Sequence, residues 1–409
     1  MAIITSILFA TLEGNIKFRT LSRANTVIEG NIEKNPSHTS IRNWTLKIGY
    51  YELNRTKEKS TDWIILLDHS IQFGREKILV ILGIREHEFL KLNRPLKYTD
   101  LTTLVTVSKN NWNGYLVSEE IEKLSLQIGS IRYAVGDYGS DLKKGLRLQG
   151  IPHIHDLSHM IALITEKLYK KDNRFIELKR KMSTMRAKFI QTDLAVVVPP
   201  KGRKKSEYQS HGKMIVWTEM ALSLVDGSLK SVSKIDTLKE FFETETLDRI
   251  KEELKWVNDY SGLIKELSEI NSIIKEIEKE MKNNGLSVNS FEKSKVILTK
   301  CESGKTKEFK QVLISKIAQQ IELLPNTDKI LFSSDILESV FGKYKNRVSD
   351  NPMASVSVLM LIIAAFTVNL TEEKIRKSIE TVKTKDITKW SEENVAVSLF
   401  QKRKLLFAA

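Results

Sequence analysis

The stretch Trp63 to Ser70, WIILLDHS in one-letter code, is an apolar run that ends in an aspartate, Asp68. A second apolar run covers residues 77–84, and a turn-like segment at 72–76 separates the two. Short continuous apolar runs bounded by turn residues are typical of buried strands, so the pair predicts a β-hairpin. The sheet of the protein therefore begins at about residue 62, and Asp68 ends its first strand.

The chain after this hairpin continues to alternate between predicted strands and helices. A β-branched run at 102–108 predicts a third strand, and an acid-rich start at Ser118 predicts a helix that ends near Gly129. A fourth strand at 131–135, a helix at 141–148 and a short strand at 151–154 follow. The predicted order is three strands, helix, strand, helix, strand, within an α/β protein that has large all-helical parts.

Two aspartates, Asp68 and Asp137, each end a predicted buried strand and are followed by turn-forming residues. Functional groups collect at the carboxyl ends of strands in open sheets, so these two side chains can converge. Converged carboxylates repel each other unless a cation neutralises them, and their hard oxygens suit Mg²⁺ or Mn²⁺. Two such ions support in-line phosphodiester chemistry. The alternative is that each aspartate only caps a turn.

The segments 66–70 and 135–141, with one aspartate on the first strand and one after the fourth, resemble the ribonuclease H-like core of DDE transposases. The resemblance implies a third acid on a later helix, and Glu338 in the segment 334–345 is the candidate. That segment is similar to the glutamate helix of bacterial insertion-sequence transposases, in which a lysine seven residues later contacts DNA.

Lys345 occupies that lysine position, and Lys343 beside it is a further candidate DNA contact. Leu331 and Ser334 replace the tyrosine and arginine that one large subgroup carries before its glutamate, so the subgroup is not fixed. Other acids, Glu219 among them, lie on predicted helices. Glu338 is preferred because its flanking residues carry the family likeness.

The motif Asp156-Leu-Ser-His159 is similar to the C/D-x-x-H motif of transposases that carry an all-helical insertion, such as the hAT and Mutator-like groups. The 201 positions from the second aspartate to Glu338 leave room for such an insertion. Asp156 and His159 are expected to support the site, and His159 can equally be a structural histidine. Trp217 and Trp256 either stack on an unpaired base or pack in the core.

The chain of 409 residues has 65 lysines and arginines against 51 acidic residues, a net charge of +14. Fourteen of the basic residues lie between residues 160 and 214, against five acids, and this favours a polyanionic partner such as DNA over a merely solvated helix face. Arg203, Lys204 and Lys205 form an expected exposed basic loop. The single cysteine, Cys301, excludes an internal disulfide and suits a reducing, intracellular setting. The expected location is the cytoplasm, in association with the bacterial nucleoid.

We expect five regions along the chain. They are an N-terminal helical, helix-turn-helix-like DNA-binding region at 1–58, a first part of the catalytic core at 62–157, a helical insertion at 158–325, a second core part at 326–375 and a helical tail at 376–409. Arg42 lies on the predicted helix 38–53 and is a candidate DNA contact. The alternative for this N-terminal region is a small helical cap on the domain that follows it. The uncharged stretch 353–370 is expected to be a buried core helix rather than a membrane span.

A short heptad seam runs from Leu263 to Met281 and favours an antiparallel helical hairpin within one chain over a dimerising zipper. No P-loop, dinucleotide or zinc-binding motif is present.

The resemblance implies a DDE transposase that cleaves and joins DNA with two Mg²⁺ or Mn²⁺ ions held by Asp68, Asp137 and Glu338. Its partners would be double-stranded DNA, at the element ends and at the target, and further copies of itself in a dimer or larger assembly, with no membrane. Two other functions stay open. One is a non-catalytic DNA-binding protein derived from a transposase, and the other is a ribonuclease H-like nuclease that only hydrolyses.

Overall fold

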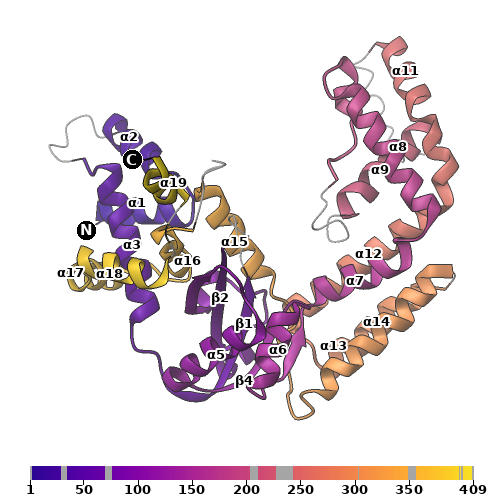
Figure 1. The fold of residues 1–409 in the computed structure, drawn as a ribbon. Coiled ribbons are helices and arrows are strands. Elements are labelled where there is room, and N and C mark those ends of the chain that lie inside the picture. The colour runs from indigo at the N-terminus through magenta and orange to yellow at the C-terminus, as the bar shows by residue number, and fades with distance from the viewer. Residues whose placement is uncertain are drawn as a thin grey trace. The chain divides into compact units, whose positions relative to one another are not determined.

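The structure is a computed structural model that describes residues 2–28, 35–69, 76–202, 211–226, 243–302, 304–348, 356–395, 397 and 399–407. The chain folds into two compact units (Figure 1). Unit 1 comprises Met1–Asp156 together with Leu331–Ala409, and unit 2 comprises Leu157–Ile330. The segment that forms unit 2 therefore interrupts the sequence of unit 1, close to where the helical insertion was expected.

Unit 1 is built on a five-stranded sheet in the order β3-β2-β1-β4-β5. The strands are β1 (Ser60–His69), β2 (Lys77–Arg85), β3 (Thr102–Lys109), β4 (Gly129–Gly136) and β5 (His153–His155). β1, β2 and β3 pair antiparallel, whereas β4 is parallel to β1 and β5 is parallel to β4. This mixed sheet flanked by helices confirms the predicted fold class, and all five strands overlap the predicted ones, although β5 begins two residues later than expected.

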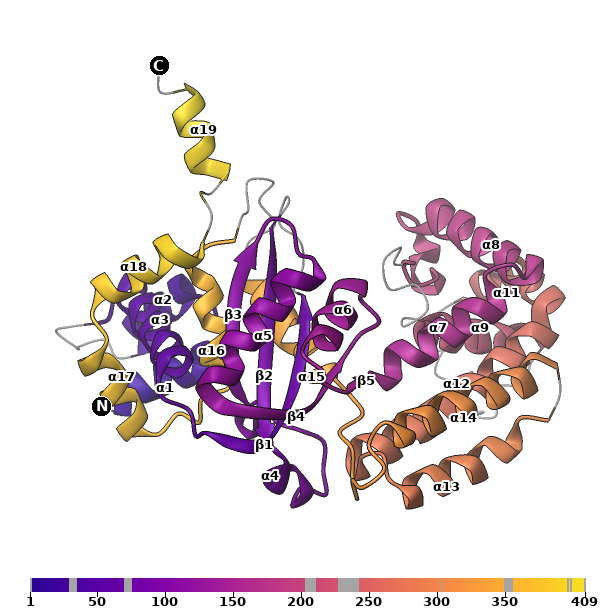
Figure 2. The same ribbon diagram turned by 60° about the horizontal axis from the view of Figure 1, so that its bottom comes forward.

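One face of the sheet is covered by α5 (Gly114–Ile128) and α6 (Ser140–Leu148), which lie in front of the strands in Figure 2. Their buried side chains pack with Ile65, Leu67 and Ala134 of the central strands in one apolar cluster. Side chains alternate between the two faces of a strand. The alternate residues of β1 and β4 therefore face the opposite side, where α15 (Asp335–Arg347) contacts β1 and α16 (Leu361–Ala365) contacts β3.

The N-terminal and C-terminal helices of unit 1 pack on each other instead of forming separate regions. α3 (His38–Asn54) contacts α16, α17 (Glu372–Thr381) and α18 (Thr384–Asn394). Lys47 of α3 donates a hydrogen bond to the Ile379 carbonyl oxygen at 2.8 Å. α1 (Ala2–Leu12) and α2 (Phe18–Ile28) pack on α3 as well. The boundaries expected at 58 and 376 thus fall inside one unit.

The remaining segments of unit 1 are short. They are α4 (Glu86–Leu90), the 3₁₀ turns η1 (Tyr98–Asp100) and η5 (Val358–Met360), and α19 (Leu399–Phe407). The expectation of one continuous helix over 353–370 is wrong in length: the described part of that stretch contains only η5 and α16. Its burial is as expected, since Met360 to Phe366 is buried throughout. No helix of the described ranges is both long and apolar enough to cross a bilayer.

Unit 2 is helical in its described residues. Its helices are α7 (Leu157–Tyr169), α8 (Asn173–Phe189), α9 (His211–Asp226), α11 (Thr244–Leu254), α12 (Ser261–Asn284), α13 (Val288–Ile297) and α14 (Gly304–Glu322), with 3₁₀ turns η2 (Asp193–Val197), η3 (Lys255–Tyr260) and η4 (Leu298–Lys300). α12 carries the predicted seam and packs on α7, α9, α13 and α14 of the same chain. These contacts bury the seam internally, as the hairpin interpretation predicted.

Candidate active site

Asp68 and Asp137 lie next to each other at the carboxyl ends of the two central parallel strands. Leu67 of β1 pairs with Gly136 of β4, and the two aspartates follow these residues directly. Neighbouring strands run about 4.8 Å apart, so the backbones that carry the two carboxylates are adjacent. The sheet thus brings together two acids that lie far apart in the sequence.

Both aspartates belong to the sheet face on which α15 packs. Leu67 and Ala134 point into the cluster under α5 and α6, and alternation then assigns Asp68 and, beyond the strand end, Asp137 to the opposite face. On that face Tyr133 of β4 is fully buried, and its hydroxyl accepts a hydrogen bond from the Leu331 amide at 2.9 Å. This contact marks where the chain returns from unit 2 and leads into α15.

Glu338 lies in the first turns of α15, the helix that contacts β1. Its side chain is exposed, whereas Leu337 and Val340 of the same helix are buried. Among the residues that the structure describes, no three acidic, histidine or cysteine side chains are grouped closely enough to hold a metal ion. The structure thus brings Asp68 and Asp137 together, whereas Glu338 lies on the helix that contacts β1 and is not grouped with them as a third metal ligand among the described residues.

The two aspartates suit a divalent cation without a complete cage of protein ligands. Mg²⁺ commonly binds through one or two carboxylates, several waters and the phosphates of its substrate. One oxygen of each aspartate is oriented by a nearby backbone amide: Asp68 Oδ1 accepts from the His69 N–H at 2.6 Å, and Asp137 Oδ1 accepts from the Gly139 N–H at 2.8 Å. The donor chemistry and the adjacency of the pair thus fit the expected ion.

An unpredicted contact between a histidine and an aspartate flanks Asp68 and Asp137. His69 Nε2 lies 2.8 Å from Asp141 Oδ2, with side chains that are 10% and 22% exposed. The contact with His69, more than any other, lowers the pKa of Asp141 to about 2. The His69 ring also packs against Trp112, with the ring centroids 5.2 Å apart. Sequence reasoning missed this pair because nothing local relates residue 69 to residue 141.

Asp156 connects the end of the sheet to the start of α15. It follows β5 and is 1% exposed, and its Oδ2 accepts hydrogen bonds from the Ser334 amide at 2.6 Å and the Ser334 hydroxyl at 3.0 Å. Ser334 is the residue before α15, so a carboxylate sits at the positive end of that helix. Asp156 therefore orients the helix that carries Glu338. His159 lies in α7 of unit 2, half-buried.

Aromatic side chains line the strand-end residues beside Asp156. The rings of Tyr138 and His155 stack at 3.9 Å, and the ring of His153 lies 4.4 Å from that of His155. Burial, with the Asp156 charge as a smaller cause, raises the pKa of Tyr138 to about 12. Burial followed by the proximity of His155 lowers the pKa of His153 to about 4. At neutral pH this stack is therefore uncharged at Tyr138 and His153.

The candidate DNA-binding residues differ in how accessible they are. Lys345 is exposed on α15. Lys343 lies over the Tyr98 ring at 4.1 Å and 3.7 Å from Glu13, so its ammonium group is held by contacts within unit 1. Arg42 is half-buried on α3, and burial lowers its pKa. Arg203, Lys204 and Lys205 lie outside the described residues.

Trp217 and Trp256 meet in unit 2. Their ring centroids are 6.5 Å apart with an interplanar angle of 29°, and both side chains are half-buried. Trp217 Nε1 donates to the Val197 carbonyl at 3.1 Å, and Lys181 Nζ lies 5.6 Å from the Trp256 ring centroid and 5.1 Å from that of Tyr260. A partly exposed aromatic pair beside a lysine is a surface on which a nucleic-acid base can stack.

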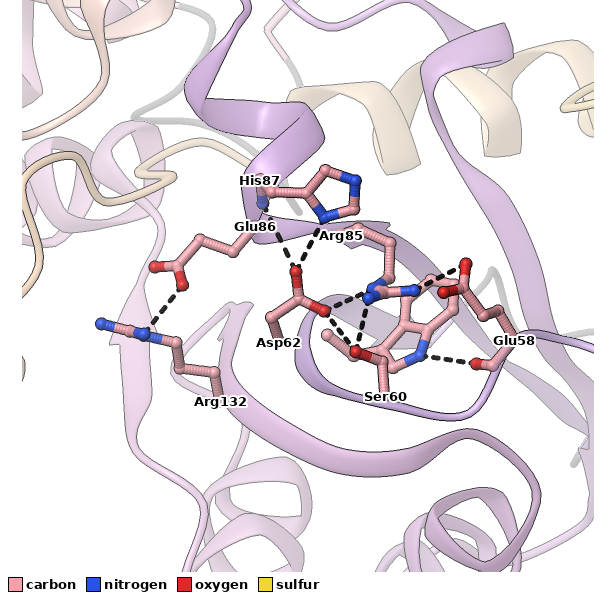
Figure 3. Close-up of polar contacts among 8 residues, drawn as sticks. Glu58, Ser60, Asp62, Arg85, Glu86, His87 and Arg132 are labelled. Carbon is pink, nitrogen blue, oxygen red and sulfur yellow. Dashed lines mark hydrogen bonds and ion pairs between the residues drawn. The ribbon is translucent and has the colours of Figure 1, made fainter.

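A second charged cluster lies at the opposite end of the central strands (Figure 3). Asp62 Oδ1 accepts from the Arg85 guanidinium, and Asp62 Oδ2 lies 2.9 Å from His87 Nδ1. Arg85 also pairs with Glu58 at 2.8 Å. Burial acts to raise the pKa of Asp62, but hydrogen bonds from His87, Ser60 and Arg85 outweigh it and hold the pKa well below its usual range. This cluster joins β1 to β2 and is structural.

Replacing Asp62 with Asn is expected to lower the free energy of unfolding by about 1–2 kcal/mol at pH 7, because hydrogen bonds from charged donors are lost. The folded-state pKa of Asp62 is depressed, so its stabilisation is present above its unfolded-state pKa and declines as the pH falls through the folded value. The difference between wild type and variant should therefore shrink below pH 4.

Denaturant unfolding at pH 7, 5 and 2 measures this difference. Glu58→Gln is the control, since its carboxylate is 75% exposed and should contribute little. A difference that is equally large at pH 7 and pH 2 would contradict the assignment to the ionised Asp62.

No family model matches the sequence, and a search of curated proteins finds no match. Among solved structures, the chain is similar to a Drosophila P element transposase strand transfer complex, with a TM-score of 0.44 and 10% sequence identity. The alignment covers 91% of this chain and 92% of that chain. The fold assignment rests on the strand order and register described above.

Proposed function

We propose that this chain is a DDE transposase that cleaves DNA and joins the cut ends to a target. The observation that carries the proposal is the placement of Asp68 and Asp137 at the ends of neighbouring parallel strands, on the sheet face that α15 covers. Two carboxylates in this position serve phosphodiester chemistry when divalent cations neutralise them.

Asp68 and Asp137 would hold the ions, and Glu338 is the candidate third ligand. When bound, two Mg²⁺ or Mn²⁺ ions activate the attacking water or 3′-hydroxyl and stabilise the leaving oxygen. The residues of the chain itself contribute placement: Asp156 orients the start of α15, and the exposed Lys345 on that helix can neutralise a phosphate.

The DNA partner is supported by charge. The surplus of nine positive charges between residues 160 and 214 lies in unit 2, the same unit as the Trp217–Trp256 pair. Phosphate neutralisation by lysine and arginine makes binding steeply salt-dependent. We therefore expect double-stranded element ends and target DNA as substrates, and an assembly of two or more copies that brings two ends together.

The test incubates the purified full chain with labelled duplexes carrying the terminal sequences that flank its gene, a target plasmid and Mg²⁺. Products in which the labelled end is joined to the plasmid support the proposal. Hydrolysed but unjoined DNA would show a nuclease instead, and shifted but intact DNA would show a non-catalytic binding protein.

Replacing Trp256 with Ala is expected to weaken binding of a single-stranded oligonucleotide by about 1–3 kcal/mol, because one stacking surface is lost. Fluorescence anisotropy of the labelled oligonucleotide measures the change. Tyr115→Ala is a matched control, since Tyr115 is an exposed ring with a lysine over it, at 3.9 Å, in unit 1. Unchanged binding with a lower melting temperature would show that Trp256 only packs in the core.

A further inference from the structure

His69 and Asp141 contact each other on the α6 side of the sheet, next to the strand ends that carry Asp68 and Asp137. His69 follows Asp68 in β1, and alternation sends the two side chains to opposite faces of the sheet. Asp68 belongs to the α15 face, whereas His69 is on the α6 side and lies 2.8 Å from Asp141 at the start of α6. The pair therefore joins the end of β1 to the helix that follows Asp137.

The loop between Asp137 and α6 is tightly built around this contact. Asp137 Oδ1 accepts the Gly139 N–H, and Asp141 Oδ1 accepts the Leu142 N–H at 3.0 Å. A Cβ atom at Gly139 would lie 2.9 Å from Asp137 Oδ1 and 3.0 Å from Asp141 Oδ1. Both carboxylates thus lie close to the same glycine, and we expect a shift of Asp141 to displace Asp137 as well.

His69 is itself held in place. Its ring packs on Trp112, and Trp112 Nε1 donates to the Lys77 carbonyl oxygen of β2 at 2.9 Å. The chain of contacts runs from β2 through Trp112 and His69 to Asp141, and ends at the loop that orients Asp137. The links lie in β1, β2, α6 and the loop between β3 and α5 that carries Trp112, all within unit 1.

We propose that His69 and Asp141 are positioning residues that fix the Asp137 carboxylate relative to Asp68, and so set the affinity of the site for a divalent cation. The proposal rests on the proposed function, because it needs Asp68 and Asp137 to bind the ion. Removing a residue that contacts a metal ligand without touching the metal itself commonly weakens metal binding about 10–100-fold.

The experiment measures Mn²⁺ binding to the full chain by calorimetry, without DNA, in His69→Ala and Asp141→Asn. Positioning predicts that both variants bind Mn²⁺ about tenfold or more weakly. His69→Gln can place an amide nitrogen near the Nε2 position and should recover most of the affinity. Gly139→Ala keeps both side chains of the pair but crowds the two carboxylates, and it should weaken binding as well.

The sign of the His69→Ala effect separates positioning from simpler roles. If Asp141 acted only through its charge, or were itself a metal ligand, removing His69 would release its carboxylate and tighten Mn²⁺ binding. Tighter or unchanged binding in His69→Ala would therefore overturn the proposal. Thermal unfolding of each variant reports whether a loss of affinity follows from a loss of fold, and an affinity loss that His69→Gln does not recover would also count against positioning.

Two further variants distinguish a failure of the positioning role from a failure of the proposed metal site. Asp137→Asn tests the metal site alone: if it leaves Mn²⁺ binding unchanged, the site is wrong and the positioning role falls with it. If Asp137→Asn weakens binding and His69→Ala does not, only the positioning role is wrong. His87→Ala is the matched control, because it breaks a second His–Asp contact of 2.9 Å at the other end of β1.

Discussion

Asp137→Asn is expected to abolish strand cleavage and joining, with a rate loss of roughly a thousandfold or more. A metal-bound carboxylate contributes several kcal/mol to the stabilisation of charge in the transition state, and each 1.4 kcal/mol corresponds to about a tenfold change in rate. The asparagine side chain keeps the shape of the aspartate and an oxygen that can accept the Gly139 N–H. The fold and DNA binding should therefore be nearly unchanged.

Two measurements check this expectation side by side: product formation on labelled end duplexes with Mg²⁺, and a gel shift of the same duplexes without it. Asp62→Asn is the matched control, since it makes the same substitution at the opposite end of the same sheet and should retain full chemistry. Wild-type rates in Asp137→Asn would remove Asp137 from the site.

Asp156→Ala is expected to lower the free energy of unfolding of unit 1 by about 3 kcal/mol. The substitution leaves the buried Ser334 amide and hydroxyl without their acceptor, and unsatisfied buried donors are costly. It also removes a negative charge from the N-terminal end of α15. We expect cleavage to fall together with stability, because α15 carries Glu338.

Hydrogen exchange localises the effect, since the Ser334 amide is itself a donor to Asp156 and should exchange faster in the variant. Asp156→Asn retains an acceptor oxygen and should lose less stability, and Ser334→Ala should lose only the contribution of the hydroxyl. A stable Asp156→Ala variant with undiminished protection at residues 334–338 would show that another contact holds the helix.

The sheet could be predicted from sequence because its strands are buried and apolar. Trp63 to Leu67 and Ile78 to Ile84 carry no charged residue, and the structure has strands at both places. Helix boundaries were less accurate. α5 begins at Gly114 because the Asn113 side chain caps it, four residues before the acid-rich start that the sequence suggested. In the 353–370 stretch, burial was correct but length was not.

The candidate site could be predicted from sequence only in part, because some of its contacts depend on the tertiary fold. Asp68 and Asp137 were found by a rule about strand ends, and the observed register places them side by side. The contacts that hold the neighbourhood together, His69 with Asp141 and Ser334 with Asp156, join positions that only the tertiary fold brings near. The Lys47 contact with Ile379, 332 positions away, likewise merges regions that the sequence suggested were separate.

The interruption of unit 1 by unit 2 has a consequence for synthesis. A ribosome completes all five strands before it reaches the roughly 170 residues of unit 2, and only then makes α15 and α16. At about 5–20 residues per second, synthesis of unit 2 takes on the order of 10–30 s. During this time the sheet face that α15 and α16 later cover stays without these two helices. A message truncated within the part that encodes unit 2 would thus yield a chain that has all five strands but lacks both α15 and α16.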